Sequence, residues 1–312
     1  MKKTFAKTVA KFMRKNLRIF FVTADMGYDA LEGLAQEFPD RFLNVGVSEA
    51  NSVGISAGLA LSGYKVIFYA QATFATMRCF EQVRLDVASN NLDVNIIGTS
   101  AGFALSQYGV SHYALEDVGL MRLLPNMKIF CPGDLYEVES ATEFILTHKG
   151  PSYLRIGRMS GGPDVNIHKK KPVSVTGLIK IRDGKDVAIV ASGSMLIKAV
   201  SVGEMLEKSG ISSSVFSMPV VKPINKKNIA RLKRFPLVAV MEEHYAVGGA
   251  GSAISEMLWD DHSDPKLLKL GCPDFFIHVA GSREDMLRRC GLSVGKMVSS
   301  IKFSLKKQRP NR

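Results

Sequence analysis

The sequence predicts an α/β protein with two consecutive domains whose sheets are mostly parallel. Short apolar runs alternate with helix-like segments along nearly the whole chain, which is typical of parallel strands connected by helices. The length of 312 residues and the hydrophobic content of 46% favour more than one core. A stretch rich in Gly, Pro and charge, 161–172, lacks apolar periodicity and predicts a linker between a first domain, 1–160, and a second, 173–312.

The first domain is predicted to open with an amphipathic helix, because Phe5, Val9 and Met13 fall on one helical face. Strands and helices then alternate along the chain. The predicted strands are 18–23, 42–45, 65–69, 94–98, 128–131 and 152–156. The predicted helices are 28–38, a small-residue stretch that ends at 60, 74–88, 115–124 and 135–147.

The second domain repeats this alternation after the linker. Its predicted strands are 186–191, 214–217, 237–241 and 275–279. Its predicted helices are 195–209, 225–235, 248–259 and a terminal helix from 294. Two parallel sheets, each covered by helices on both faces, follow from this order.

The chain is basic, with 41 Lys and Arg against 29 Asp and Glu and a net charge of +12. The excess lies in the first 20 residues, at 168–171 and at 306–312, with no interleaved aromatics and no recognition module. This distribution argues against nucleic-acid binding and favours solvated surface and a site for phosphate-bearing ligands.

The cysteines predict an oxidation state and a compartment. The four cysteines form no Cys-x-x-Cys pair, so we expect free thiols in a reducing, cytoplasmic compartment and no structural zinc. Lys11 and Arg14 interrupt the apolar region that a signal peptide would need. No apolar run approaches the 18 residues or more of a membrane span, so no membrane helix is predicted.

A single carboxylate, Glu49, stands where a strand end meets a helix of small residues in the stretch 44–60. Gly54 and Gly58 leave one helical face almost bare, so another helix could approach it closely. Partial desolvation at this place would make Glu49 a candidate for proton exchange. The alternative is a glutamate that satisfies free backbone N–H groups, with Ser48 as the cap.

Other candidate residues also follow predicted strands. Asp25, Glu49, Phe74 and the loop 99–112 should meet at the carboxyl edge of the first sheet, where ligands bind in such sheets. Phe74 is either a core aromatic or a flat surface for a ligand. His112, in a Gly-containing loop, is either functional or a capping or surface residue.

Two further segments have polar candidates. Arg155 and Arg158 lie at a strand end, where guanidinium groups suit phosphates or carboxylates; the alternative is an ion pair with surface acids. The segment 241–252 contains acids and glycines but has the spacing of neither the P-loop nor the dinucleotide fingerprint. We therefore predict no nucleotide site there.

From about residue 18 to about residue 300, the chain resembles the C-terminal half of transketolases. The similar segments occur in the family's order and are LNVGVSEANSVGISAGLAL at 43–61, FATMRCFEQVR at 74–84, GVSHYALEDVGLM at 109–121, PSYLRIGR at 151–158, GSM at 193–195 and MEEHYAVGGAGSA at 241–253. The resemblance implies a pyrimidine-binding domain followed by the family's C-terminal domain.

The resemblance also implies thiamine diphosphate as cofactor and gives roles to individual residues. In the family, a glutamate at the position of Glu49 hydrogen-bonds N1′ of the aminopyrimidine, and an aromatic at the position of Phe74 stacks on that ring. His112 matches a histidine that contacts the donor carbonyl and assists proton transfer. Arg158 matches an arginine that binds the sugar phosphate. Asp25, at the end of the first strand, is expected to contact the cofactor.

One motif of the family is missing. Transketolases bind the diphosphate through Mg²⁺ with a Gly-Asp-Gly motif, which this chain lacks. The resemblance therefore implies a partner subunit that ligates the metal, in a heterotetramer of two copies of each chain, with the bare helix face after Glu49 at the packed interface. The implied activity is transfer of a ketol or related acyl unit from a ketose-type donor to an aldehyde.

The sequence departs from the family around the donor. Ser100 stands where classical transketolases have a second histidine, Tyr108 where they have an aspartate, and Gln71 where they have a second stacking aromatic. We expect Ser100 and Tyr108 to line a substrate pocket that differs from the classical one, with sugar-phosphate or related ligands.

Three alternatives stay open. The chain could be the β subunit of a 2-oxo acid dehydrogenase, or a 1-deoxyxylulose-phosphate-synthase-like enzyme, in which Arg78 lies near a substrate-binding arginine. It could also be a non-catalytic scaffolding subunit. The joint presence of Glu49, Phe74 and His112 argues against this last alternative.

Overall fold

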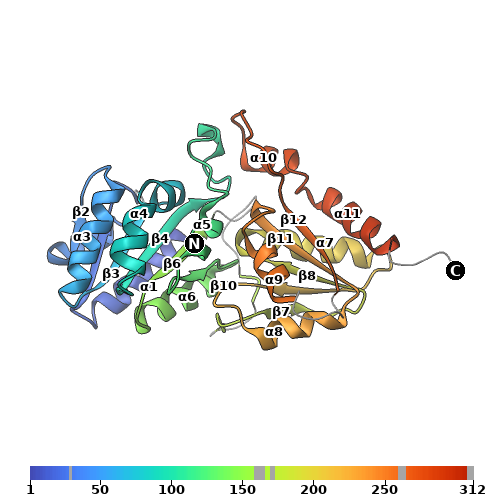
Figure 1. Ribbon diagram of the computed structural model, residues 1–312, viewed down its shortest axis with the longest axis horizontal. Helices are drawn as coiled ribbons and strands as arrows, with labels where there is room; N and C mark the ends of the chain where they lie inside the picture. The colour runs from blue at the N-terminus through green and yellow to red at the C-terminus, as the bar shows by residue number, and fades with distance from the viewer. Residues whose placement is uncertain (28–29, 158–165, 169–172, 259–264, 308–312) are drawn as a thin grey trace.

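The structure is a computed structural model, and it describes residues 1–27, 30–157, 166–168, 173–258 and 265–307. Two α/β units lie side by side, one around a seven-stranded sheet and the other around a five-stranded sheet (Figure 1). The prediction of two consecutive α/β domains with mostly parallel sheets is confirmed.

The first sheet has the strand order β10-β5-β6-β4-β3-β1-β2. The first six strands of the chain pair in parallel, whereas β10 adds to the edge antiparallel to β5. Strands β3, β4 and β6 are buried almost throughout because they are covered on both faces. The bounds are β1 Ile19–Thr23, β2 Phe42–Asn44, β3 Lys65–Gln71, β4 Val94–Ala101, β5 Lys128–Phe130, β6 Ser152–Gly157 and β10 Val220–Lys222.

Helices cover both faces of this sheet. On one face, α1 packs beside α6, and Phe5, Val9 and Met13 are fully buried, so the predicted amphipathic face is confirmed. On the other face, α3, α5 and the helical segment 74–88 share a second apolar cluster. The bounds are α1 Lys2–Met13, α2 Glu32–Glu37, α3 Glu49–Leu61, α4 Phe80–Gln82, α5 Asp117–Leu123 and α6 Leu135–Thr147.

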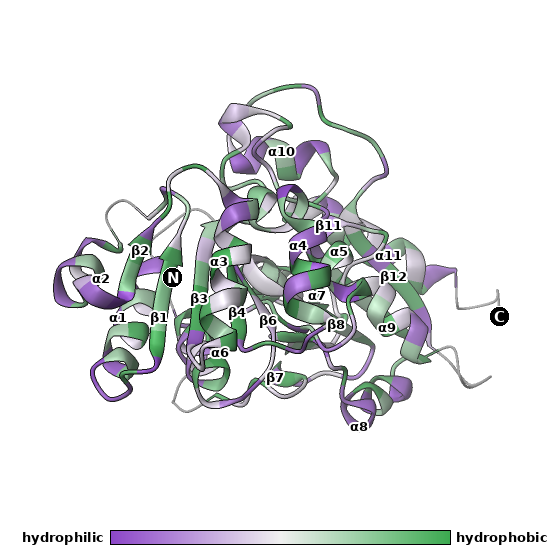
Figure 2. Ribbon diagram, turned by 60° about the vertical axis from the view of Figure 1, so that its left-hand side comes forward, coloured by the Kyte–Doolittle hydropathy of each residue, from purple (hydrophilic) through white to green (hydrophobic). Residues whose placement is uncertain are grey.

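The second sheet has the order β12-β11-β8-β9-β7, with β7 antiparallel at one edge. Its strands β8 and β11 are buried almost throughout, whereas hydrophilic helical segments such as α8 lie on the outside (Figure 2). The strands are β7 Ile179–Arg182, β8 Val187–Ala191, β9 Ser213–Ser217, β11 Leu237–Tyr245 and β12 Lys266–Cys272. The helices are α7 Leu196–Glu207, α8 Lys226–Ala230, α9 Ala250–Leu258, α10 Arg283–Arg289 and α11 Val294–Lys306.

The predicted strand 275–279 is wrong. Its aromatic residues Phe275 and Phe276 are exposed, and the fifth strand of this sheet is the preceding segment, β12. The edge position explains the error, because β12 is only partly buried and carries two lysines that interrupt its apolar pattern. The strands β7 and β10 and the helix α10 were not predicted.

Other helical predictions are corrected in detail. The predicted helix 74–88 is interrupted by two π-helical turns, Phe74–Arg78 and Val83–Ala88. Part of the predicted helix 28–38 falls outside the described residues, and the helix observed there is α2. All four cysteines are buried free thiols. No helix in the part of the chain that the structure describes has the length and apolarity needed to cross a bilayer.

Candidate active site

Glu49 begins α3 and is buried, with 2% of its surface exposed. Its Oε2 accepts a hydrogen bond of 2.7 Å from Nη1 of Arg78. Ser48 takes the N-cap position without a side-chain cap, because its hydroxyl donates to the carbonyl of Val45. The alternative in which Ser48 caps the helix is therefore not what the structure shows.

Phe74 lies directly opposite the same guanidinium. It begins the first π-helical turn after β3, and this turn carries Arg78 back over the Phe74 ring, with 4.0 Å from the guanidinium carbon to the ring centroid. Turns of this kind are rare and concentrate at functional sites. Glu49 and Phe74 thus contact one flat group from two sides.

The ring of His112 completes this group. It meets Phe74 edge-on at 5.5 Å and lies 5.1 Å from the ring of the exposed Tyr108. The carbonyl of His112 accepts hydrogen bonds from Nε2 of Gln71 at 2.9 Å and from the hydroxyl of Thr73 at 3.3 Å. Gln71, which we noted only as a missing aromatic, therefore anchors the backbone of His112.

Ser100 lies near the carboxyl end of β4 with a left-handed backbone, φ +55°, and is 6% exposed. It lines a cavity of about 370 Å³ together with Lys2, Lys3 and Gly157. The lining of this cavity thus includes two basic residues. Arg158, the residue after Gly157, lies outside the described residues.

Asp25 lies at the carboxyl end of β1, as predicted, with φ +51°. Asn44 at the end of β2 accepts from the backbone N–H of Asp25 at 2.9 Å and donates to its carboxylate at 3.1 Å. Both residues line a small cavity of about 150 Å³ with Thr23. Among the described contacts, those of Asp25 are with Asn44 and not with the group of Glu49, Phe74 and Arg78.

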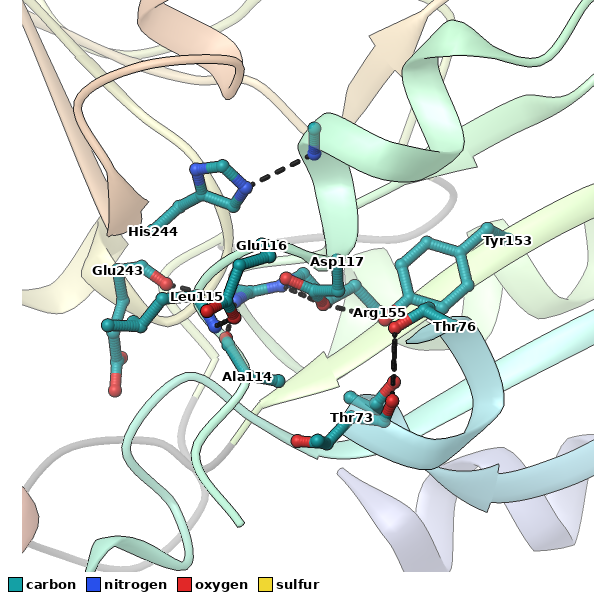
Figure 3. Close-up of polar contacts among 12 residues, drawn as sticks. Thr73, Thr76, Ala114, Leu115, Glu116, Asp117, Tyr153, Arg155, Glu243 and His244 are labelled. Atoms are coloured by element: carbon teal, nitrogen blue, oxygen red, sulfur yellow. Dashed lines mark hydrogen bonds and ion pairs between the residues drawn. The ribbon is translucent and has the colours of Figure 1, made fainter. Parts of the chain in front are cut away.

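Arg155 has neither of the roles considered from the sequence. Its Nε donates to Oδ2 of Asp117 at 2.7 Å, and the two side chains are 5% and 0% exposed. Tyr153 donates to the same carboxylate oxygen at 2.6 Å (Figure 3). Burial alone would raise the pKa of Asp117, but the charge and hydrogen bond of Arg155 outweigh it and hold that pKa below its usual value. Arg155 is therefore part of a buried ion pair.

A glutamate of β11 already binds the N-terminus of α9, in the Gly-containing segment. The carboxylate of Glu242 accepts from the N–H groups of Ala250 at 2.7 Å and Gly251 at 2.9 Å. A helix N-terminus that is already satisfied in this way offers no free N–H groups at these positions for a phosphate.

Two family models match the chain in succession. Residues 1–163 match the transketolase pyrimidine-binding domain, and residues 177–297 match the transketolase C-terminal domain. These two domains in this order define a class of thiamine-dependent transferases. The chain belongs to the transketolase family.

Relatives of two lengths are similar to the chain. A protein of Methanocaldococcus jannaschii described as a transketolase C-terminal section is 33% identical, with 99% of this chain and 97% of the relative covered. A 6-deoxy-6-sulfo-D-fructose transketolase subunit from a Clostridium species is 32% identical, with coverage of 96% and 92%. A 1-deoxy-D-xylulose-5-phosphate synthase from a Synechococcus species is 30% identical, but the chain spans only 47% of its length.

A solved structure described as a split gene transketolase, an inactive β4 tetramer, is similar over 98% of both chains, with 33% identity and a TM-score of 0.86. The prediction of a split-transketolase subunit with two transketolase domains is thus confirmed at the level of family and fold.

Proposed function

We propose that this chain is the smaller subunit of a split transketolase-type enzyme that transfers a two-carbon ketol unit, or a related acyl unit, from a ketose-type donor to an aldehyde. One observation carries the proposal. The guanidinium of Arg78 lies over Phe74 at 4.0 Å and donates to Glu49 at 2.7 Å. A planar group with N–H donors thus fits between the acid and the aromatic ring, and an aminopyrimidine protonated at N1′ is also flat and presents N–H donors.

Thiamine diphosphate, when bound, supplies the carbon nucleophile that C–C transfer between sugars requires. Glu49, almost fully buried, would hold a proton at N1′ of the aminopyrimidine, and burial keeps that proton from water. Phe74 would provide a flat apolar surface for the ring. His112, oriented through its carbonyl by Gln71 and Thr73, would exchange a proton with the donor oxygen.

The proposal includes a partner subunit that supplies the Mg²⁺ ligands, in an assembly of two copies of each chain. The absence of a Gly-Asp-Gly motif from the sequence supports it. The α3 face is open in the isolated chain, because a side chain added at Gly54 or Gly58 would meet no atom of the described residues within 4 Å. This bare face is available for close packing against a helix of the partner.

Calorimetry tests the assignment of cofactor and partner together. We expect thiamine diphosphate with Mg²⁺ to bind the mixture of this chain and a subunit that contains Gly-Asp-Gly, and not this chain alone. Tight binding to the isolated chain would contradict the need for a partner. An assembled complex that does not bind the cofactor would contradict the cofactor assignment.

The donor is proposed to be an anionic ketose that differs from the classical substrates. The basic residues Lys2 and Lys3 in the lining of the cavity beside Ser100 support an anionic end. Arg158 is proposed as a further donor-binding residue because it matches the family's sugar-phosphate arginine. Ser100 and Tyr108 replace residues that contact classical donors. The Clostridium relative is named for a sulfonated sugar, and this name supports a non-classical anionic donor here. Full turnover of xylulose 5-phosphate with ribose 5-phosphate would count against an altered donor site.

The second candidate is a 1-deoxyxylulose-phosphate-synthase-like enzyme. The 30% identity to such a synthase and the place of Arg78 beside Glu49 favour it. Transfer of an acyl unit from a 2-oxo acid to an aldehyde, with release of CO₂, would identify this candidate, whereas ketol transfer without CO₂ would identify the first.

Arg78 provides a prediction about cofactor affinity. If its guanidinium stands where the aminopyrimidine binds, Arg78→Ala removes a competitor. A displaced contact of ~1 kcal/mol, typical of a half-exposed cation on an aromatic ring, corresponds to about fivefold tighter binding of thiamine diphosphate. We also propose that Arg78, once displaced by the cofactor ring, contacts the donor, so the donor KM should rise in the same variant.

Titration of the assembled complex with thiamine diphosphate measures the effect of Arg78→Ala. Arg84→Ala is the matched control, because Arg84 is exposed on the same helical segment and lines a separate cavity. Weaker cofactor binding by Arg78→Ala alone would show that the guanidinium belongs to the cofactor site and does not stand in for the ring.

A further inference from the structure

The loop that carries Tyr108 and His112 is closed at its base. Gly102 and Ala114 exchange two backbone hydrogen bonds of 3.0 Å, so the residues between them form one excursion from the end of β4. The place of the His112 ring relative to Phe74 therefore depends on what holds this base.

A carboxylate from the second domain holds it. Glu243 of β11 is 1% exposed, and its Oε1 accepts from the N–H of Phe103 at 2.8 Å. Oε2 accepts from the hydroxyl of Ser194 at 2.7 Å, and Arg283 donates to both oxygens, with Nε 2.9 Å from Oε1. A Cβ at Gly102 would lie 2.6 Å from the Glu243 carboxyl carbon, so the loop backbone rests directly on this group.

The groups around the Glu243 carboxylate favour its charged form. Burial alone would raise the pKa of Glu243, but Arg283, Ser194 and the N–H of Phe103 outweigh burial and keep the pKa below its usual value. A buried charge pair is weak evidence for stability, since apolar residues of similar volume often stabilise a fold as well. Its directional hydrogen bonds instead fix where the loop begins.

The second domain reaches the loop at other points too. Nη2 of Arg155 donates both to the carbonyl of Ala114 at 3.0 Å and to the carbonyl of Glu243 at 2.9 Å, which ties the other end of the base to the same strand (Figure 3). Near the tip, the hydroxyl of Ser106 donates to the carbonyl of Gly281 at 2.9 Å. The loop accordingly rises beside α10 (Figure 1).

We propose that Glu243, held by Arg283, is a positioning residue through which the C-terminal domain sets the place of His112 in the active site of the first domain. This inference rests on the proposed function of His112 in proton exchange with the donor. It gives the second domain, to which none of the described contacts of Glu49 and Phe74 belongs, a defined part in the reaction.

The test compares Glu243→Gln with Glu256→Gln in the assembled complex. Glu256 also contacts the first domain, through a 2.6 Å ion pair with Arg122 of α5, but its side chain is 64% exposed and bonds no residue of the loop in the described contacts. We expect Glu243→Gln to lower kcat ~10–100-fold, as a small misplacement of a catalytic group does, and to leave the affinity for thiamine diphosphate within about twofold. Glu256→Gln should change neither quantity.

Deuterium exchange gives a readout that does not require turnover. The peptide that covers 103–113 should exchange at least about tenfold faster in Glu243→Gln than in Glu256→Gln, because its base loses charged hydrogen bonds. Exchange at the wild-type rate with an unchanged kcat would overturn the proposal. If Glu243→Gln does not fold, Arg283→Lys provides the same comparison, with a smaller effect because the charge is retained.

A double variant tests whether Glu243 affects kcat through the position of His112 or through a general loss of stability. In a His112→Gln background, Glu243→Gln should have almost no further effect on kcat, since the group it positions is already absent. Additive losses would overturn the inference. If the complex shows no thiamine-dependent turnover at all, the proposed function fails, while the exchange experiment still decides whether Glu243 holds the loop.

Discussion

Glu49→Gln is expected to lower ketol transfer by the assembled complex by roughly 10³-fold, within the range that general acid–base groups contribute. An amide at this position can accept a hydrogen bond but cannot take up the proton that we propose Glu49 shares with the cofactor ring. The change should spare the fold, because the amide oxygen can still accept from Arg78, the described partner of the carboxylate. Steady-state turnover at saturating thiamine diphosphate measures the loss.

Glu81→Gln is the matched control for this experiment. Glu81 is an exposed glutamate on α4, just beyond the turn that carries Arg78, so it undergoes the same chemical change outside the proposed site. We expect this control to keep wild-type turnover. An active Glu49→Gln enzyme would remove the proposed mechanism, whatever the structure of the site.

The architecture was largely predictable from the local sequence pattern, and the errors of the prediction have a physical cause. A fully buried parallel strand such as β8 is a continuous apolar run, which the sequence displays directly. Edge strands lack this signal, since one side of β12 is solvated and its lysines break the run. The apolar segment 275–279 has the sequence pattern of a strand. Its phenylalanines are nevertheless exposed, and it pairs with no strand of the described sheet.

The candidate site was predictable in its residue types but not in its geometry. Motifs identified Glu49, Phe74 and His112, and the rule that ligands bind at the carboxyl edge of parallel strands placed them together. The role of Glu243 was not visible, because it contacts Phe103 across 140 residues of chain. Two consecutive acids in an otherwise apolar strand were the available signal, since buried carboxylates require partners.

The buried pair of Asp117 and Arg155 leads to the largest expected effect on stability. Asp117→Asn leaves the guanidinium of Arg155 buried without its counter-charge, which typically costs about 3–5 kcal/mol in the free energy of unfolding. Tyr153 also loses a charged acceptor. Asp183→Asn is the control, because Asp183 forms an exposed pair with Lys180, and such pairs contribute about 0–1 kcal/mol.

The same pair predicts how stability depends on pH. The folded pKa of Asp117 lies below its unfolded value, so its contribution is fully present above the unfolded pKa and is lost as the pH falls through the folded pKa. Urea unfolding of the wild type should therefore weaken more steeply in acid than that of Asp117→Asn, and the two curves should converge at low pH. A constant difference between them across the acid range, or a loss below about 1 kcal/mol at neutral pH, would show that the ion pair contributes little. Arg155 also holds the base of the His112 loop. Turnover by the assembled complex with Asp117→Asn should therefore fall at urea concentrations at which the protein is still folded.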